Sequence, residues 1–201
     1  MNKHFINGFF AIINPIGEIL ESAEIHPHVI TAAGLFLSVI SGVLFWKGYI
    51  FCGGIVLIVS GACDVLDGRL ARKTNTNSRF GALLDSTVDR YSEIAVYMGL
   101  AAFFNSPFIH ALIILAIAGS LLTSYVRARA EGLGIECKVG LMQRPERITF
   151  LAVGAVIGSI FDFIFGTHQA LLVLAILGIA VLSNFTVIQR MLVVRDNSKN
   201  K

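Results

Sequence analysis

Four aspartates stand in two pairs between residues 64 and 89 of a strongly apolar chain. Asp64 and Asp67 are three residues apart, and Asp85 and Asp89 are four residues apart. If both segments are helical, each pair projects from one helix face. Two such faces turned toward each other would gather four carboxylates, which repel one another strongly in apolar surroundings unless they bind cations. Because carboxylate oxygen is the preferred ligand of Mg²⁺ and Mn²⁺, this spacing predicts a divalent-metal site.

Helix capping or pairing with arginine is the alternative role for these aspartates. The arginines nearby in the sequence are Arg69, Arg72, Arg79 and Arg90. Such contacts would account for one or two of the aspartates, but hardly for all four at helical spacing. We therefore favour the metal site.

The composition indicates an integral membrane protein. The chain has 201 residues, of which 55% are hydrophobic and 14% charged, and its mean hydropathy is +0.76, well beyond an ordinary soluble domain. Nearly uncharged runs lie at about 28–46, 48–63, 91–126, 148–167 and 169–189. The third run is too long for one span and is broken by Asn-Ser-Pro at 105–107. We therefore expect an all-α protein with six transmembrane helices, each near the roughly 20 residues that a bilayer requires.

The distribution of charge predicts the orientation of these spans. In the six-helix layout, every lysine and arginine except Lys47 falls toward one membrane face. Positive charge concentrates on the cytoplasmic side, so both termini and the aspartates are expected to face the cytoplasm from the cell membrane. The net charge of +3 suits anionic lipids or a phosphorylated substrate, and nucleic acid is not an expected partner. Cys52, Cys63 and Cys137 are too widely spaced to indicate a disulfide or a zinc site.

We expect one membrane domain over residues 1–201. Residues 1–25 mix aromatic and aliphatic residues with polar ones, which predicts an amphipathic helix at the membrane interface. A signal peptide is the alternative, but no small-residue cleavage site follows a suitable apolar core. Residues 26–195 would form the six-helix bundle, and residues 196–201 a polar tail.

The connection between the second and third spans brings the aspartate pairs together. Residues 73–79 are short and polar, so these two spans are expected to be antiparallel neighbours. Gly61 and Gly68 lie beside Asp64 and Asp67 and leave that helix face thin. Close helix packing would explain them, and so would a bulky ligand that approaches the backbone.

Several arginines are expected at the depth of the aspartates. Arg127, Arg147 and Arg190 stand inside or at the edge of predicted helices, where a cluster would bind a phosphate dianion through bidentate contacts. Arg144 is a reserve candidate for the same role. The alternative role, anchoring at the cytoplasmic membrane surface, is the one we favour for Arg129, Lys138 and Arg195.

The segment around the aspartates resembles the signature of the CDP-alcohol phosphotransferases, the class I CDP-alcohol phosphatidyltransferases. The matching pattern reads Asp64-x-x-Asp67-Gly68-x-x-Ala71-Arg72-x(8)-Gly81-x(3)-Asp85-x(3)-Asp89, and every specified position is present. Ser-Tyr-x-Arg-Ala-Arg-Ala-Glu at 124–131 and Arg-Pro-Glu-Arg at 144–147 are similar to segments of prokaryotic phosphatidylinositol phosphate synthases. His28 stands where the family's Pro-Asn-x-x-Thr segment has asparagine.

The resemblance implies the transfer of a phosphatidyl group from CDP-diacylglycerol, or another CDP-linked lipid, to an alcohol, with release of CMP. It also implies two Mg²⁺ or Mn²⁺ ions. Asp64, Asp67 and Asp85 would hold metal, while Asp89 would border the metal site and take the proton of the acceptor. The residues expected to contact the nucleotide or line its pocket are Thr31, Gly68, Ala71, Arg72, Ser78 and Gly81.

The acceptor is expected to be a phosphorylated polyol held by Arg127, Arg147 and Arg190. Inositol 1-phosphate is our hypothesis, and glycerol 3-phosphate, the acceptor of phosphatidylglycerophosphate synthases, is the alternative. A homodimer is usual in the family. A cation transporter is a remote alternative, because transport sites usually lie near the bilayer midplane between internal repeats.

Overall fold

A computed structural model describes residues 26–73 and 78–198, together with Glu18 and Ser22. Of residues 71–73 it describes the backbone alone. Glu18 and Ser22 are helical. The rest of the predicted interfacial helix at 1–25 lies outside the described residues.

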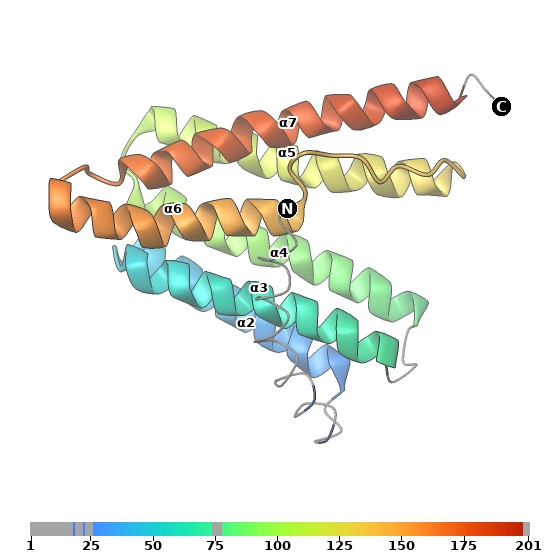
Figure 1. Ribbon diagram of the computed structural model, residues 1–201, viewed down its shortest axis with the longest axis horizontal. Coiled ribbons are helices and arrows are strands. Elements are labelled where there is room, and N and C mark those ends of the chain that lie inside the picture. Colours follow the sequence, from blue (N-terminus) through green and yellow to red (C-terminus); the bar gives the residue numbers. More distant parts are fainter. Residues whose placement is uncertain (1–17, 19–21, 23–25, 74–77, 199–201) are drawn as a thin grey trace.

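The described residues form long helices, which confirms the all-α expectation (Figure 1). The helices are α2 (Pro27–Trp46), α3 (Ile50–Lys73), α4 (Arg79–Phe103), α5 (Pro107–Gly132), α6 (Arg144–Phe165) and α7 (Ala170–Ser198). The break expected at 105–107 separates α4 from α5. Because α7 continues to Ser198, the first part of the expected polar tail is helical.

Local sequence explains several of the helix ends. Pro27 and Pro107 stand at the first position of α2 and α5, where the missing N–H costs no helical hydrogen bond. Ser78 caps α4 by accepting a hydrogen bond of 2.8 Å from the backbone N–H of Gly81. Gly166 ends α6 with φ of 63°, a left-handed conformation that favours glycine.

Five of the described helices are long and apolar enough to cross a membrane: α2, residues 50–70 of α3, α5, α6 and α7. The helix outside this group is α4, which is long enough but carries four charged residues in its first fifteen positions after Arg79: Asp85, Asp89, Arg90 and Glu93. The sixth span of the predicted layout therefore depends on the apolar part of α4, which begins at Tyr91. It stays a prediction.

The helices pack as two groups that α3 and α6 connect. In one group α2 packs against α3 and α4, and in the other α7 packs against α5 and α6. Figure 1 shows α5, α6 and α7 on one side and α2 and α3 on the other. Between α2 and α4 the backbones approach closely, since a Cβ atom added at Gly99 would collide with the backbone of Gly42. Small residues permit such close contact between membrane helices.

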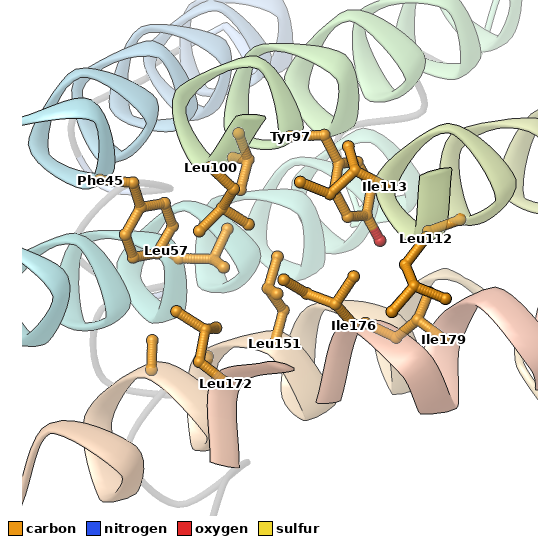
Figure 2. Packing of buried hydrophobic residues seen from close by; sticks show 14 of the residues in the cluster. Phe45, Leu57, Tyr97, Leu100, Leu112, Ile113, Leu151, Leu172, Ile176 and Ile179 are labelled. Atoms are coloured by element: carbon orange, nitrogen blue, oxygen red, sulfur yellow. The ribbon is translucent and has the colours of Figure 1, made fainter. Parts of the chain in front are cut away.

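The main apolar core lies between the two groups (Figure 2). It contains Phe45, Leu57, Leu100, Ile113, Leu151, Leu172 and Ile176, all buried. A smaller cluster of Ile30, Leu66 and Leu70 packs α2 against α3 near the aspartates. The core fixes the helices relative to one another and so sets the positions of the polar side chains at one end of the bundle.

Candidate active site

The structure brings the two aspartate pairs together. Asp64 and Asp67 lie on the second half of α3, and Asp85 and Asp89 lie on the first half of α4. Asp85 is close enough to the other three carboxylates for its charge to act on each of them. The antiparallel arrangement expected from the short 73–79 connection therefore creates the concentration of negative charge that the spacing predicted.

Thr31 on α2 fixes the carboxylate of Asp67. Its hydroxyl donates a hydrogen bond of 2.7 Å to Asp67 Oδ2 and contacts the carbonyl of Pro27 at 3.2 Å. Asp67 is buried, with 4% of its surface exposed. The bond orients one carboxylate of the cluster and connects a third helix to it, a role for Thr31 beyond the predicted nucleotide contact.

Arg144, at the start of α6, lies between the two aspartate pairs. Its Nη1 atom is 2.5 Å from Asp64 Oδ2 and 2.9 Å from Asp89 Oδ1. All three side chains are largely buried. Arg90 also approaches Asp89, but at 3.5 Å. The sequence predicts Arg144 only as a reserve candidate for binding the acceptor phosphate. The structure places it directly among the aspartates.

Asp89 lies two residues before the apolar part of α4, which begins at Tyr91. Burial raises the pKa of its carboxyl to about 7, against the effect of Arg144, and the nearby charges of Asp64 and Asp85 raise it further. A group with a pKa near 7 is suited to accept a proton at neutral pH. This supports the expectation that Asp89, among the four, acts as the base.

The chemistry of the four carboxylates fits a hard divalent cation. As their side chains lie, however, no three His, Cys, Asp or Glu groups in the described ranges form a ready ligand set. The guanidinium of Arg144 lies between two of the expected ligands instead. Asp89 Oδ1, although buried and near Arg144, makes no geometrically sound hydrogen bond to any described residue. This oxygen therefore has lone pairs available to coordinate a metal ion.

The predicted nucleotide residues occupy two places beside the aspartates. Gly68 follows Asp67 directly on α3. Ser78 and Gly81 meet at the start of α4, where a Cβ added at Gly81 would lie 3.0 Å from Ser78 Oγ and 3.1 Å from His28 Cε1. His28 therefore stands with this group. Ala71 and Arg72 belong to α3, but their side chains lie outside the described residues.

Arg147 is buried and bonded to protein groups. Its Nε and Nη2 atoms donate to the carboxylate of Glu93 on α4 at 2.9 and 3.0 Å, and its Nη1 atom donates to the carbonyl of Met142 at 3.3 Å. Only 3% of its surface is exposed. Glu93 was not among the predicted residues. Its position one turn after Asp89 was the available signal.

Arg190 and Arg127 complete the predicted basic group. Arg190, 2% exposed, donates to the carbonyls of Val139 at 2.7 Å and Thr123 at 2.6 Å. Arg127 is more exposed and pairs with Glu131 at 3.0 Å. The charges of Arg127 and Arg147 act on Arg190, so the three form one basic cluster. Arg147 and Arg190 also hold the connection between α5 and α6 in place.

The profile of the CDP-alcohol phosphatidyltransferase family matches residues 24–182, which contain the four aspartates of the site together with Arg127 and Arg147. The chain belongs to this family. It is therefore a CDP-alcohol phosphatidyltransferase, as the resemblance predicted, and a multi-pass membrane protein, as the composition predicted. The alternative of a cation transporter is not supported.

Two relatives match this phosphatidyltransferase over nearly its whole length. The archaetidylinositol phosphate synthase of Methanothermobacter thermautotrophicus is 35% identical over 200 residues, 99% of this chain and 98% of the relative. The phosphatidylinositol phosphate synthase of Mycobacteroides abscessus is 37% identical over 194 residues, 94% of this chain and 86% of the relative. The predicted likeness to prokaryotic phosphatidylinositol phosphate synthases is confirmed.

Solved structures of one relative share the fold of this phosphatidyltransferase. The Mycobacterium tuberculosis phosphatidylinositol phosphate synthase with CDP-DAG bound has a TM-score of 0.79 and 33% identity, and the match covers 92% of this chain and 94% of that one. A second structure of that enzyme, in complex with manganese and citrate, has the same TM-score and covers 90% and 88%. A divalent metal and a CDP-linked lipid are thus bound by a protein of this fold.

Proposed function

We propose that this phosphatidyltransferase transfers the phosphatidyl group of CDP-diacylglycerol to a hydroxyl of inositol 1-phosphate and releases CMP. The observation that carries the proposal is the convergence of Asp64, Asp67, Asp85 and Asp89 between α3 and α4. The relatives support the choice of donor and acceptor, since several are phosphatidylinositol phosphate synthases and one was crystallised with CDP-DAG.

The four aspartates would hold the divalent ions, Mg²⁺ or Mn²⁺ and two in number. Thr31 orients Asp67 for this role. When bound, the ions would neutralise the pyrophosphate of the donor and stabilise the departing CMP. The manganese complex of the M. tuberculosis relative supports the choice of metal.

Asp89 would accept the proton of the acceptor hydroxyl. The hydroxyl oxygen then forms a bond to the lipid-linked phosphorus, and the bond from that phosphorus to the oxygen of CMP breaks. In the site without metal the pKa of Asp89 is raised to about 7, and such a carboxylate is a stronger base than that of an ordinary aspartate.

The donor nucleotide would bind beside the aspartates. Gly68 would let it approach the backbone of α3, and Arg72 would pair with its phosphate groups, as the family resemblance implies. The group of Thr31, Ser78 and Gly81 would line the cytidine pocket. This pocket would lie at the starts of α2 and α4. The lipid tails of a donor bound there would stay in the membrane leaflet.

The basic cluster would attract the phosphate of the acceptor. Arg127 is accessible for contact, while Arg147 and Arg190 contribute positive charge and hold the connection between α5 and α6. The positive charge of this cluster would not increase the binding affinity of an uncharged acceptor such as free inositol.

The topology proposed for the enzyme has six spans, with α4 as the sixth. Both termini and the aspartates would then face the cytoplasm, where the soluble acceptor is found. We also propose a homodimer, as is usual in the family.

The proposal is tested with the purified protein, CDP-diacylglycerol and Mg²⁺ or Mn²⁺. CMP release is measured with inositol 1-phosphate, glycerol 3-phosphate, free inositol and serine as separate acceptors. We expect release with inositol 1-phosphate and a phosphatidylinositol phosphate product. Release with glycerol 3-phosphate alone would overturn the acceptor assignment, and no release with any acceptor would overturn the donor assignment.

A further inference from the structure

Arg144 differs from the other buried arginines in what it binds. Arg147 and Arg190 donate mainly to a carboxylate outside the aspartate cluster and to backbone carbonyls. Arg144 instead bridges Asp64 and Asp89 through the single atom Nη1. Two of the expected metal ligands are therefore paired with an internal cation.

We propose that Arg144 couples metal binding to acceptor binding: it is displaced from Asp64 and Asp89 by the divalent ion and then binds the phosphate of the acceptor. This inference rests on the proposed function, because it assigns a second position to a residue of the same site.

The first step follows from competition for the same oxygens. Arg144 Nη1 forms ion pairs with Asp64 Oδ2 at 2.5 Å and with Asp89 Oδ1 at 2.9 Å, the second without the geometry of a hydrogen bond. A divalent ion on these carboxylates would use the same lone pairs and would repel the guanidinium at short range in a largely buried site. The ion and Arg144 therefore exclude each other from the two aspartates.

The second step follows from how loosely Arg144 is otherwise held. Its Nε atom is buried and makes no hydrogen bond to any residue in the described ranges. Arg147, one turn later, is fixed by bonds to Glu93 and Met142. The contacts that hold Arg144 are thus mainly those that the metal would replace.

A small cavity with space for about one water molecule adjoins Arg144. The cavity lies between α2, α3, α4 and α6, and its polar lining consists of Ser38, Ser60, Ser92, Glu93, Arg144 and Arg147. It is continuous with the position that Arg144 occupies, since Arg144 forms part of its wall.

The third step concerns what the released guanidinium would bind. A guanidinium separated from its carboxylates is a strong bidentate partner for a phosphate dianion. Arg144 stands at the aspartates, next to the place of reaction, whereas Arg147 and Arg190 have their donors committed to protein acceptors. If the metal releases Arg144, it raises the affinity for the acceptor phosphate, and the acceptor raises the affinity for the metal by the same factor.

The experiment measures Mn²⁺ binding to the purified protein by electron paramagnetic resonance, without the lipid donor and hence without turnover. Wild type is compared with Arg144→Met, Arg144→Lys and the matched control Arg195→Met. Arg195 is an exposed arginine that pairs only with its neighbour Asp196 among the described contacts. The control removes the same charge and adds the same side chain far from the aspartates in sequence.

We expect Arg144→Met to bind Mn²⁺ on the order of tenfold more tightly than wild type, because the internal competitor is gone. Inositol 1-phosphate, but not free inositol, should tighten Mn²⁺ binding several-fold in wild type and in Arg195→Met. That coupling should disappear in Arg144→Met. Arg144→Lys should show a smaller gain in Mn²⁺ affinity and should lose most of the coupling.

An unchanged or weaker Mn²⁺ affinity in Arg144→Met would overturn the inference. If that variant does not fold, full coupling in Arg144→Lys would overturn it as well. These outcomes are distinct from failure of the proposed function, which is judged by CMP release from wild type. An enzyme that turns over inositol 1-phosphate but whose Arg144→Met variant binds Mn²⁺ as wild type does would refute only the coupling.

Discussion

Glu93 on α4 accepts hydrogen bonds of 2.9 and 3.0 Å from Arg147 on α6, one helical turn from the pair formed by Asp89 and Arg144. Two acid and arginine pairs thus connect the same two helices. The pair of Asp89 and Arg144 lies among the proposed metal ligands, while the pair of Glu93 and Arg147 lies deeper. The deeper pair supports the reactive one, because Arg147 also holds the carbonyl of Met142 before α6 begins.

Replacement of Glu93 with alanine should destabilise the protein strongly. It would leave the buried guanidinium of Arg147 without its carboxylate, which costs on the order of 3–5 kcal/mol. Thermal unfolding in detergent measures the loss. The matched control is Glu131→Ala, which removes the partner of the more exposed Arg127 and should cost less than about 1 kcal/mol. Equal losses in the two variants would show that the buried pair has no special role.

Loss of the Thr31 hydroxyl should weaken metal binding. Thr31→Val keeps the side-chain volume but removes the hydrogen bond to Asp67, so the carboxylate loses its fixed orientation. We expect the Mn²⁺ concentration for half-maximal CMP release to rise roughly tenfold, within the range found for lost outer contacts of metal ligands. Thr31→Ser restores the hydroxyl and should return this concentration close to that of wild type. A Thr31→Ser variant as impaired as Thr31→Val would argue for a packing role.

The close approach of α2 and α4 should make Gly99 sensitive to substitution. A Cβ at this position would meet the backbone of Gly42, which has no flexible end that can move aside. Gly99→Ala should therefore lower stability by about 1–3 kcal/mol or more, despite the better helix propensity of alanine. At Gly178 a Cβ would meet only the ring of Phe150, at 3.9 Å. Gly178→Ala is thus the control and should be neutral or stabilising in the same unfolding assay.

Local sequence features were enough to predict most of the helices and the meeting of the two aspartate pairs. The apolar runs predicted α2, α3, α6 and α7, and the break at 105–107 predicted the separation of α4 from α5. The short connection at 73–79 predicted that the aspartate pairs would meet. Helices extend beyond the apolar runs, as α3 does to Lys73 and α7 to Ser198, because polar residues continue a helix outside the membrane. The apolar pattern says nothing about those ends.

The pairs across α4 and α6 were not predictable in this way. Glu93 and Arg147 are 54 residues apart, and no periodicity in the sequence connects them. Arg144 and Arg147 lie in one short segment, yet one binds the aspartates and the other binds Glu93. Their different roles arise from the rotation of α6 against α4, which depends on packing of the whole core. The sequence could identify the arginines but not assign their partners.

Asp89→Asn should abolish most of the activity while the protein stays folded. The amide cannot accept the proton of the acceptor, so CMP release should fall by about 10² to 10⁴, the usual contribution of a general base. Binding of CDP-diacylglycerol, measured by its protection against thermal unfolding, should be retained in part through the other three aspartates. Near-normal CMP release by Asp89→Asn would transfer the role of base to another group.

The raised pKa of Asp89 predicts how metal binding depends on pH. Below a pH of about 7 this carboxyl holds a proton, and the protonated acid is a poor ligand, so the ion must displace the proton to bind. Mn²⁺ affinity should therefore rise as the pH increases from about 5.5 to 7 and level off above that. Titrations of Mn²⁺ at a series of pH values, followed by electron paramagnetic resonance, measure the dependence. Asp89→Asn has no proton to lose at this position, so its affinity should be lower and should rise much less over the same interval. An equally steep rise in Asp89→Asn would assign the titrating proton to another carboxylate of the cluster.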